Sequence, residues 1–136
     1  MQFTDLVKET GYVISFEAIS EPRTDNISLR LIVNRSEDAS DLLIYPHLDS
    51  KVTTLQIDFP NYITYSVTYD DYTIWNDDEI FQGESFRIYD KSNYLDFILK
   101  EFKLTDRKVK HFSLACFEHK VDIISEDEPI ISEIVL

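Results

Sequence analysis

Residues 62–102 read YITYSVTYDDYTIWNDDEIFQGESFRIYDKSNYLDFILKEF, and this stretch decides the fold. Apolar and polar residues alternate over 63–69, which is the two-residue period of a strand with one buried face. A second short strand is expected at 85–89, and 92–102 has the period of a helix. An acidic, aromatic loop at 70–80 separates the two strands. Strand, loop, strand and helix in this order predict a sheet that carries a helix on one face.

The helix prediction rests on one apolar stripe and a capping residue. Ser92 precedes the stripe, and a serine hydroxyl there can accept a hydrogen bond from an N–H group of the first turn. The stripe falls at positions i, i+3, i+4 and i+7 and consists of Leu95, Ile98, Leu99 and Phe102.

Further strands are predicted on both sides of this stretch, at 12–20, 27–33, 53–59, 112–117 and 121–124. The first two are expected to form a hairpin across a polar turn. We also expect 53–59 to pair with 63–69, with Phe59 opposite Ile63, because this register keeps both apolar rows on one side.

The remaining segments are less regular. Apolar residues at helical spacing predict a short helix at 3–7, with Gly11 as its C-terminal cap. The segment 36–50 leaves strand and helix open, and 130–136 is expected to be an edge strand or a docked tail. Together these segments predict an α+β fold, a mainly antiparallel sheet of five to seven strands with one or two helices packed on one face, in a single domain spanning 1–136.

The charge balance restricts the classes of partner. The chain has 13 basic and 26 acidic residues, a net charge of -13 and 43% hydrophobic residues. Such a balance repels nucleic-acid phosphates and anionic lipid, so no nucleic-acid partner and no membrane association is expected. It favours a basic protein partner, although a merely solvated acidic surface is an equally simple interpretation. The oligomeric state stays open.

Compartment and chemistry are constrained mainly by missing features. The single cysteine, Cys116, has no disulfide partner, and neither a signal peptide nor an apolar membrane span is recognisable, so a cytoplasmic location is expected. His111, Cys116 and His119 are the closest grouping of soft ligands, but on a strand they do not share one face. No phosphate loop, nucleophile elbow or calcium loop occurs either, and we therefore predict no catalytic residue, no metal site and no cofactor.

The loop holds the most distinctive cluster of side chains. Aromatic residues serve as buried anchors at protein interfaces, and neighbouring carboxylates attract a basic partner. A simpler interpretation is that Trp75 packs into the core while the acids are solvated. The predicted partner-binding residues are Tyr69, Asp70, Asp71, Tyr72, Trp75, Asp77, Asp78 and Glu79.

Two segments, SFRIYDKSNYLDF at 85–97 and the residues 111–129, resemble those of small, acidic, uncharacterised bacterial proteins. The resemblance implies a bacterial, cytoplasmic context and assigns no functional residue. In size and charge the chain also resembles immunity proteins, which neutralise toxin domains.

The leading hypothesis is a non-catalytic protein-binding domain, an immunity-type inhibitor whose acidic aromatic loop covers the basic active site of a nuclease-like toxin. The alternative is a small-ligand-binding or enzymatic domain with a pocket between sheet and helix, lined by Tyr65, Tyr89 and His111 and holding a carboxylate of raised pKa. A homo-oligomer joined through a sheet edge is a third interpretation.

Overall fold

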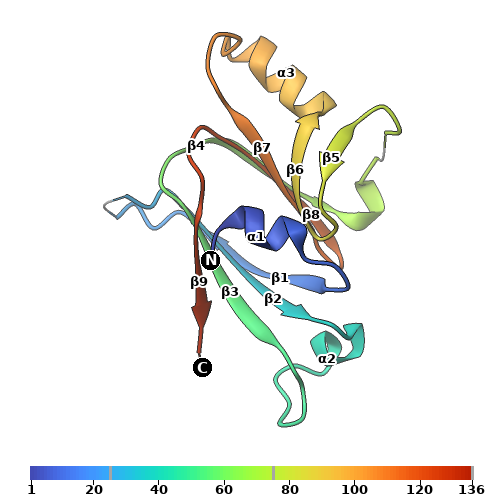
Figure 1. The fold of residues 1–136 in the computed structure, drawn as a ribbon. Coiled ribbons are helices and arrows are strands. Elements are labelled where there is room, and N and C mark those ends of the chain that lie inside the picture. Colours follow the sequence, from blue (N-terminus) through green and yellow to red (C-terminus); the bar gives the residue numbers. More distant parts are fainter. Residues whose placement is uncertain (25, 75, 136) are drawn as a thin grey trace.

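A computed structural model describes residues 1–24, 26–74 and 76–135. Its strands form two antiparallel sheets (Figure 1). The first sheet has the order β1-β2-β3-β9 and consists of β1 (Val13–Ser20), β2 (Leu29–Ser36), β3 (Thr53–Phe59) and β9 (Ile130–Ile134). The second has the order β4-β8-β7-β6-β5 and consists of β4 (Tyr62–Tyr69), β8 (His119–Ser125), β7 (Lys110–Ala115), β6 (Phe86–Lys91) and β5 (Ile80–Gln82).

The α+β class and the antiparallel pairing are confirmed, but the prediction of one sheet with five to seven strands is wrong. The described residues form nine strands in two sheets. The β1–β2 hairpin forms as expected, with a bulge between Phe16 and Ala18 that turns Ala18 out to solvent.

The hairpin expected between 53–59 and 63–69 does not form. Phe59 pairs with Leu29 of β2, and β4 pairs with β8 at the edge of the other sheet, so the chain crosses from one sheet to the other at residues 60 and 61. The hydroxyl of Ser28 supports this corner: it donates to the Phe59 carbonyl oxygen (3.3 Å) and accepts from the Tyr62 N–H (3.1 Å). Alternation fixes which face of each strand is buried, but the same alternation is compatible with either partner.

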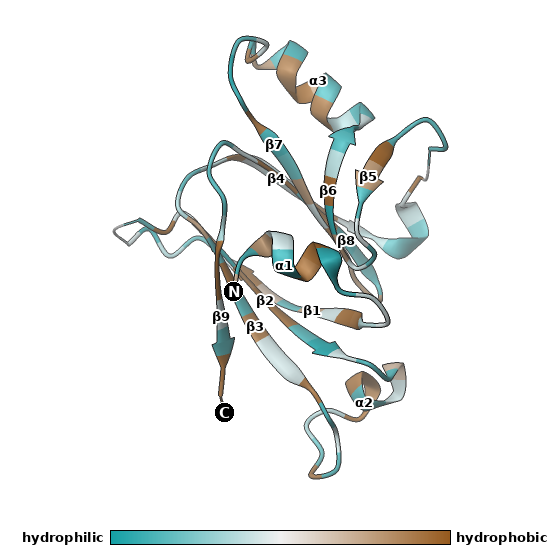
Figure 2. Ribbon diagram, viewed as in Figure 1, coloured by the Kyte–Doolittle hydropathy of each residue, from teal (hydrophilic) through white to brown (hydrophobic). Residues whose placement is uncertain are grey.

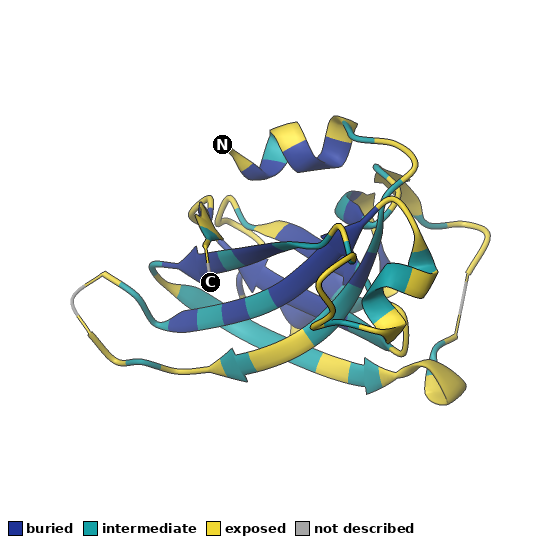
Figure 3. Cartoon of the chain, turned by 90° about the horizontal axis from the view of Figure 1, so that it is seen from below, coloured by how far each residue is buried: buried dark blue, intermediate teal, exposed yellow. Residues whose placement is uncertain are grey.

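The main core lies between the two sheets. It takes alternate residues from both, among them Leu31 of β2 and Phe112 of β7, and helix α1 (Phe3–Lys8) adds Phe3. The Phe3 ring packs edge-to-face on Phe86 (5.9 Å) and Phe112 (5.1 Å). Figure 3 shows that α1 turns its buried side to the strands, so the helix closes one side of the space between the sheets.

Helix α3 (Asn93–Glu101) covers the outer face of the second sheet. The predicted cap is confirmed, because the Ser92 hydroxyl accepts from the Leu95 N–H (3.0 Å). Leu95 and Ile98 pack on Ile124 in a second, smaller apolar cluster. Figure 2 shows the alternating polar and apolar bands of this helix. Phe102 follows the last helical residue and is exposed, so the stripe is shorter than the sequence predicted.

The three α-helices do not share one face, which corrects that part of the prediction. Helix α1 lies against the core, α3 lies on the outer face of the second sheet, and α2 (Ala39–Leu43) lies beside β1 and β2 (Figure 1). Gly11 is not the cap of α1, because the helix ends earlier at the capping residue Glu9. None of the helices in the described part of the chain is long and apolar enough to cross a membrane.

Candidate functional site

The acidic aromatic loop connects β4 to β5 and is fixed at both ends. It begins with a short 3-10 helix, η1 (Asp70–Tyr72), whose first N–H donates to the Glu118 carbonyl oxygen (2.8 Å). At its other end the Glu79 carboxylate accepts from the Asn93 N–H at the start of α3 (2.9 Å). The loop therefore has a defined position between the β4–β8 corner and the helix.

Between these anchors most of the described side chains face solvent. Tyr72 is 78% exposed and Ile74 is 81% exposed. Four exposed carboxylates surround them, and within the described residues none of the four lies in an ion pair; they are Asp70, Asp71, Asp77 and Asp78. Glu79 differs because it is partly buried and holds the helix. Trp75 lies outside the described residues, so its predicted role is untested.

An aromatic row extends the loop surface onto the sheet. The half-exposed Tyr69 ring packs edge-on to His119 (5.3 Å), and His119 in turn packs on Phe16 (5.1 Å). Strand pairing produces this row, since Tyr69 and His119 are opposite each other in the β4–β8 register. The three rings thus form a continuous row from the end of β4, next to the loop, to β1 of the first sheet.

The two acidic parts of the sequence, 70–90 and 118–133, meet at this corner and again in the lining of a pocket beneath the loop, where Glu79 and Asp122 lie. Glu118 lies beside the loop through its carbonyl contact with Asp70. Further along, Glu126 and Glu128 pair with Arg107 and Lys110 of the basic connector. The connector thus compensates two of the carboxylates in the second acidic segment.

A pocket of about 240 Å³ lies beneath the loop, between α3 and the outer face of the second sheet. Its location matches the pocket of the alternative hypothesis, but its lining differs. His111 lines it and Tyr89 stacks on the His111 ring (4.5 Å), whereas Tyr65 points to the core on the other side of the sheet. The lining residues are Ser66, Thr68, Tyr72, Thr73, Ile74, Asn76, Glu79, Asn93, Tyr94, His111, Lys120 and Asp122.

A buried chain of hydrogen bonds forms the floor of this pocket. His111 bonds Ser92 Oγ through Nδ1 (2.7 Å) and Asp122 Oδ1 through Nε2 (2.7 Å). Ser92 Oγ also accepts from the Leu95 N–H, and the ionised Asp122 carboxylate can only accept, so His111 Nε2–H is donated to Asp122. Although serine, histidine and aspartate are joined as in a hydrolase, Ser92 is buried and engaged as a helix cap, and it cannot reach a substrate.

The Asp122 carboxyl takes part in these hydrogen bonds in its ionised form, so it does not act as a proton donor. Burial alone would raise the pKa of its carboxyl, but the hydrogen bond from His111 and the charge of Lys120 outweigh burial and lower the pKa. The Lys120 ammonium lies 2.7 Å from Asp122 Oδ1. The raised carboxylate pKa that would support acid–base catalysis is thus absent at this position.

The three soft-ligand residues that are close in the sequence lie apart in the structure. His111 points to the outer pocket, Cys116 packs against the main core, and His119 lies in the aromatic row. Among residues 1–24, 26–74 and 76–135 no group of three or more His, Cys, Asp and Glu side chains could hold a metal ion. Burial raises the pKa of the Cys116 thiol to about 12, which suppresses its thiolate.

Comparisons with protein-family models, with curated proteins and with solved structures found no match. Functional inference therefore depends on the geometry above. Sequence reasoning missed the contacts between Ser92, His111 and Asp122. The signal that it did contain was alternation in β8, which places Lys120 and Asp122 on the same face, two residues apart.

Proposed function

We propose that the protein is a non-catalytic protein-binding domain that uses the acidic aromatic loop to bind a basic partner. The observation that carries this proposal is the exposure of Tyr72 and Ile74 among carboxylates that have no cationic partner in the described chain. Exposed aromatic and aliphatic side chains supply the anchors that become buried in an interface. The free carboxylates supply long-range attraction and choose partners of opposite charge.

An immunity-type inhibitor is the most concrete form of this function. The active site of a nuclease-like toxin is basic because it binds phosphates, and a cluster of carboxylates presents a comparable negative charge. The loop is tied at both ends, by Asp70 to Glu118 just before β8 and by Glu79 to α3, which limits the entropy lost when a partner binds. Covering such a site requires no chemistry from the inhibitor.

The alternative, a small-ligand-binding or enzymatic domain, has one supporting observation. A pocket does lie between sheet and helix, with His111 and Lys120 in its lining. At about 240 Å³ it is smaller than most ligand sites, and its carboxylate has a lowered pKa. The binding hypothesis is therefore preferred.

Salt-stepped affinity capture tests the proposal. The protein is immobilised, exposed to lysate of the source cell at low salt and eluted in steps, and retained proteins are identified by mass spectrometry. We expect one basic protein that resists moderate salt. Tyr72→Ala should weaken its binding by roughly 30-fold or more, the cost of a typical interface anchor.

The charge component is tested with two double variants of equal net charge. D77N/D78N alters the loop, and E101Q/D106N removes two exposed carboxylates elsewhere. Only the loop variant should lower the association rate and flatten its salt dependence. Glu79 is left unchanged because it holds α3. Equal effects of the two double variants, or retention of only a mixture of basic proteins at low salt, would reject the loop as a specific interface.

A further inference from the structure

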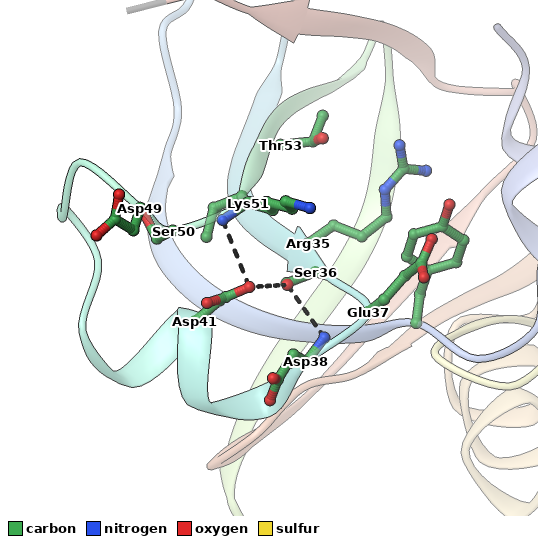
Figure 4. A pocket seen from close by; sticks show the side chains of 11 residues that line it. Arg35, Ser36, Glu37, Asp38, Asp41, Asp49, Ser50, Lys51 and Thr53 are labelled. Atoms are coloured by element: carbon green, nitrogen blue, oxygen red, sulfur yellow. Dashed lines mark hydrogen bonds between the residues drawn. The ribbon is translucent and has the colours of Figure 1, made fainter.

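A second pocket, of about 760 Å³, lies beside α2 (Figure 4), and Figure 1 shows that α2 and α3 are at opposite ends of the molecule. It forms where the end of β2, helix α2 and the segment 49–53 meet Tyr12. Its volume is in the range of small-molecule sites, and it shares no residue with the pocket beneath the acidic loop. The inference drawn from it is independent of the proposed protein-binding function.

Arg35 of β2 lines this pocket and is only 9% exposed. Its Nη1 donates to Glu9 Oε2 (2.7 Å), and its guanidinium carbon lies 4.8 Å from the centre of the Tyr12 ring. These two contacts hold the planar group in place. The buried Nε–H has no acceptor among the residues that the structure describes.

The open hydrogen-bonding capacity has a defined geometry. Glu9 takes Nη1, and on the edge that Nε–H shares with Nη2 the buried Nε–H has no acceptor in the described chain. This edge is one that binds a carboxylate with two parallel hydrogen bonds. A buried donor without a partner costs about 1–3 kcal/mol, so a ligand oxygen that reached this edge would recover stabilisation.

The pocket is lined by charged residues of both signs, four acidic and two basic. Figure 4 shows Arg35 and Lys51 on one side, and Asp38 and Asp41, which belong to the start of α2, on the other. Asp41 is only loosely satisfied: its Oδ2 lies 3.4 Å from the Lys51 backbone N and 3.5 Å from Ser36 Oγ. A carboxylate with such long contacts can accept a further, stronger donor.

We propose that this pocket binds a small zwitterion that carries a carboxylate and a primary ammonium group. The carboxylate pairs with the free edge of Arg35 and with Lys51, and the ammonium group pairs with Asp41. A molecule with both charges fits better than a simple anion, because the neighbouring acids and the net charge of -13 repel anions. It also fits better than a simple cation, which would leave the Arg35 donor unpaired.

The probes are glycine, 4-aminobutanoate and 6-aminohexanoate, with acetate and butylammonium as single-charge controls at constant ionic strength. Each is titrated into the ¹⁵N-labelled full chain, and the Arg35 Nε–H signal and the Ser36 and Lys51 amide signals are followed by NMR. At least one zwitterion should give a saturable shift of all three signals at a concentration about tenfold or more below that of either control.

Variants separate specific binding from general charge effects. Lys51→Met removes an exposed cation of the pocket, should fold normally and should weaken the zwitterion about tenfold, the effect of one charge pair. Arg35→Gln should abolish saturation. The matched control is Lys108→Met, an exposed lysine outside the pocket, which should change nothing.

Several results would overturn the inference. One is that no zwitterion gives a saturable shift. Another is that acetate acts at the same concentration as the zwitterions, and a third is that Lys51→Met and Lys108→Met have equal effects. If Arg35→Gln does not fold, the comparison of the two lysine variants still decides the question.

Discussion

Substitution of Asp122 by asparagine tests whether the buried chain beneath the pocket stabilises the fold. Asp122 is 7% exposed and accepts from His111 Nε2 and from Lys120 Nζ, both at 2.7 Å. The asparagine side chain would keep one acceptor oxygen, but the substitution would remove the negative charge opposite a half-buried ammonium group. Breaking a buried pair by removing one partner costs about 3–5 kcal/mol, which is a large part of the stability of a typical domain.

The assay is urea unfolding at pH 7, followed by circular dichroism and by tyrosine fluorescence. A loss of about 3–5 kcal/mol corresponds to a fall in Tm of roughly 10–20 °C for a chain of this size. The matched control is Glu128→Gln, the same acid-to-amide change in an exposed pair with Lys110. Surface pairs contribute about 0–1 kcal/mol, so this variant should unfold almost as the wild type does.

The pH dependence of stability tests the same role of Asp122, because it predicts the direction in which the effect of the substitution changes. The folded-state pKa of Asp122 is lowered, so its contribution is present above the ordinary aspartate pKa of 3.8 and is lost as the pH falls through the folded value. The difference in unfolding free energy between wild type and Asp122→Asn should therefore shrink as the pH falls below about 4. A cost below about 1 kcal/mol at pH 7, or a difference that grows on acidification, would refute the stabilising role.

Three further outcomes are expected. Gly83→Ala should lower the free energy of unfolding by about 3 kcal/mol or more, because φ is +99° and a Cβ would lie 2.0 Å from the Phe86 carbonyl oxygen. Gly11→Ala, at φ +81° with open space around the residue, should cost about 1 kcal/mol. Urea unfolding measures both. Ser92→Ala removes the cap of α3 and the partner of His111 Nδ1, and it should lower the free energy of unfolding by about 2 kcal/mol; a smaller effect than an exposed serine-to-alanine change would contradict the buried network. Cys116 has a thiol pKa of about 12, so at pH 8 it should react with iodoacetamide about a thousandfold more slowly in the folded than in the unfolded chain. Mass spectrometry measures the two rates, and equal rates would show that the thiol is not protected.

Local features of the fold were predictable, and long-range pairing was not. The cap at Ser92 and the strands on either side of residue 117 follow from hydrogen-bonding chemistry and from two-residue alternation, both of which act over a few residues. The pairing of β3 with β9, in contrast, joins distant segments, and alternation contains no information on the partner strand. The single-sheet prediction failed for this reason.

The candidate site divides in the same way. Exposure of the loop acids at residues 70, 71, 77 and 78 agrees with the solvation that the composition favours. The structural role of Glu79 was not predictable, because its partner at Asn93 is placed by the tertiary fold. Arg35 was missed as well, since a single arginine in an apolar strand gives no indication that its guanidinium is buried beside Glu9 and Tyr12.

The position of β9 beside β3 has a consequence for how the chain assembles. Strands β1, β2 and β3 emerge first during synthesis, but the edge of β3 receives its partner only after β4 to β8 have been made. Until then β3 presents unpaired N–H and C=O groups that another nascent chain could bind. Because contacts between distant segments form late, we expect slow folding, in milliseconds to seconds. The first sheet is the part of the fold most exposed to misassembly in a crowded cell.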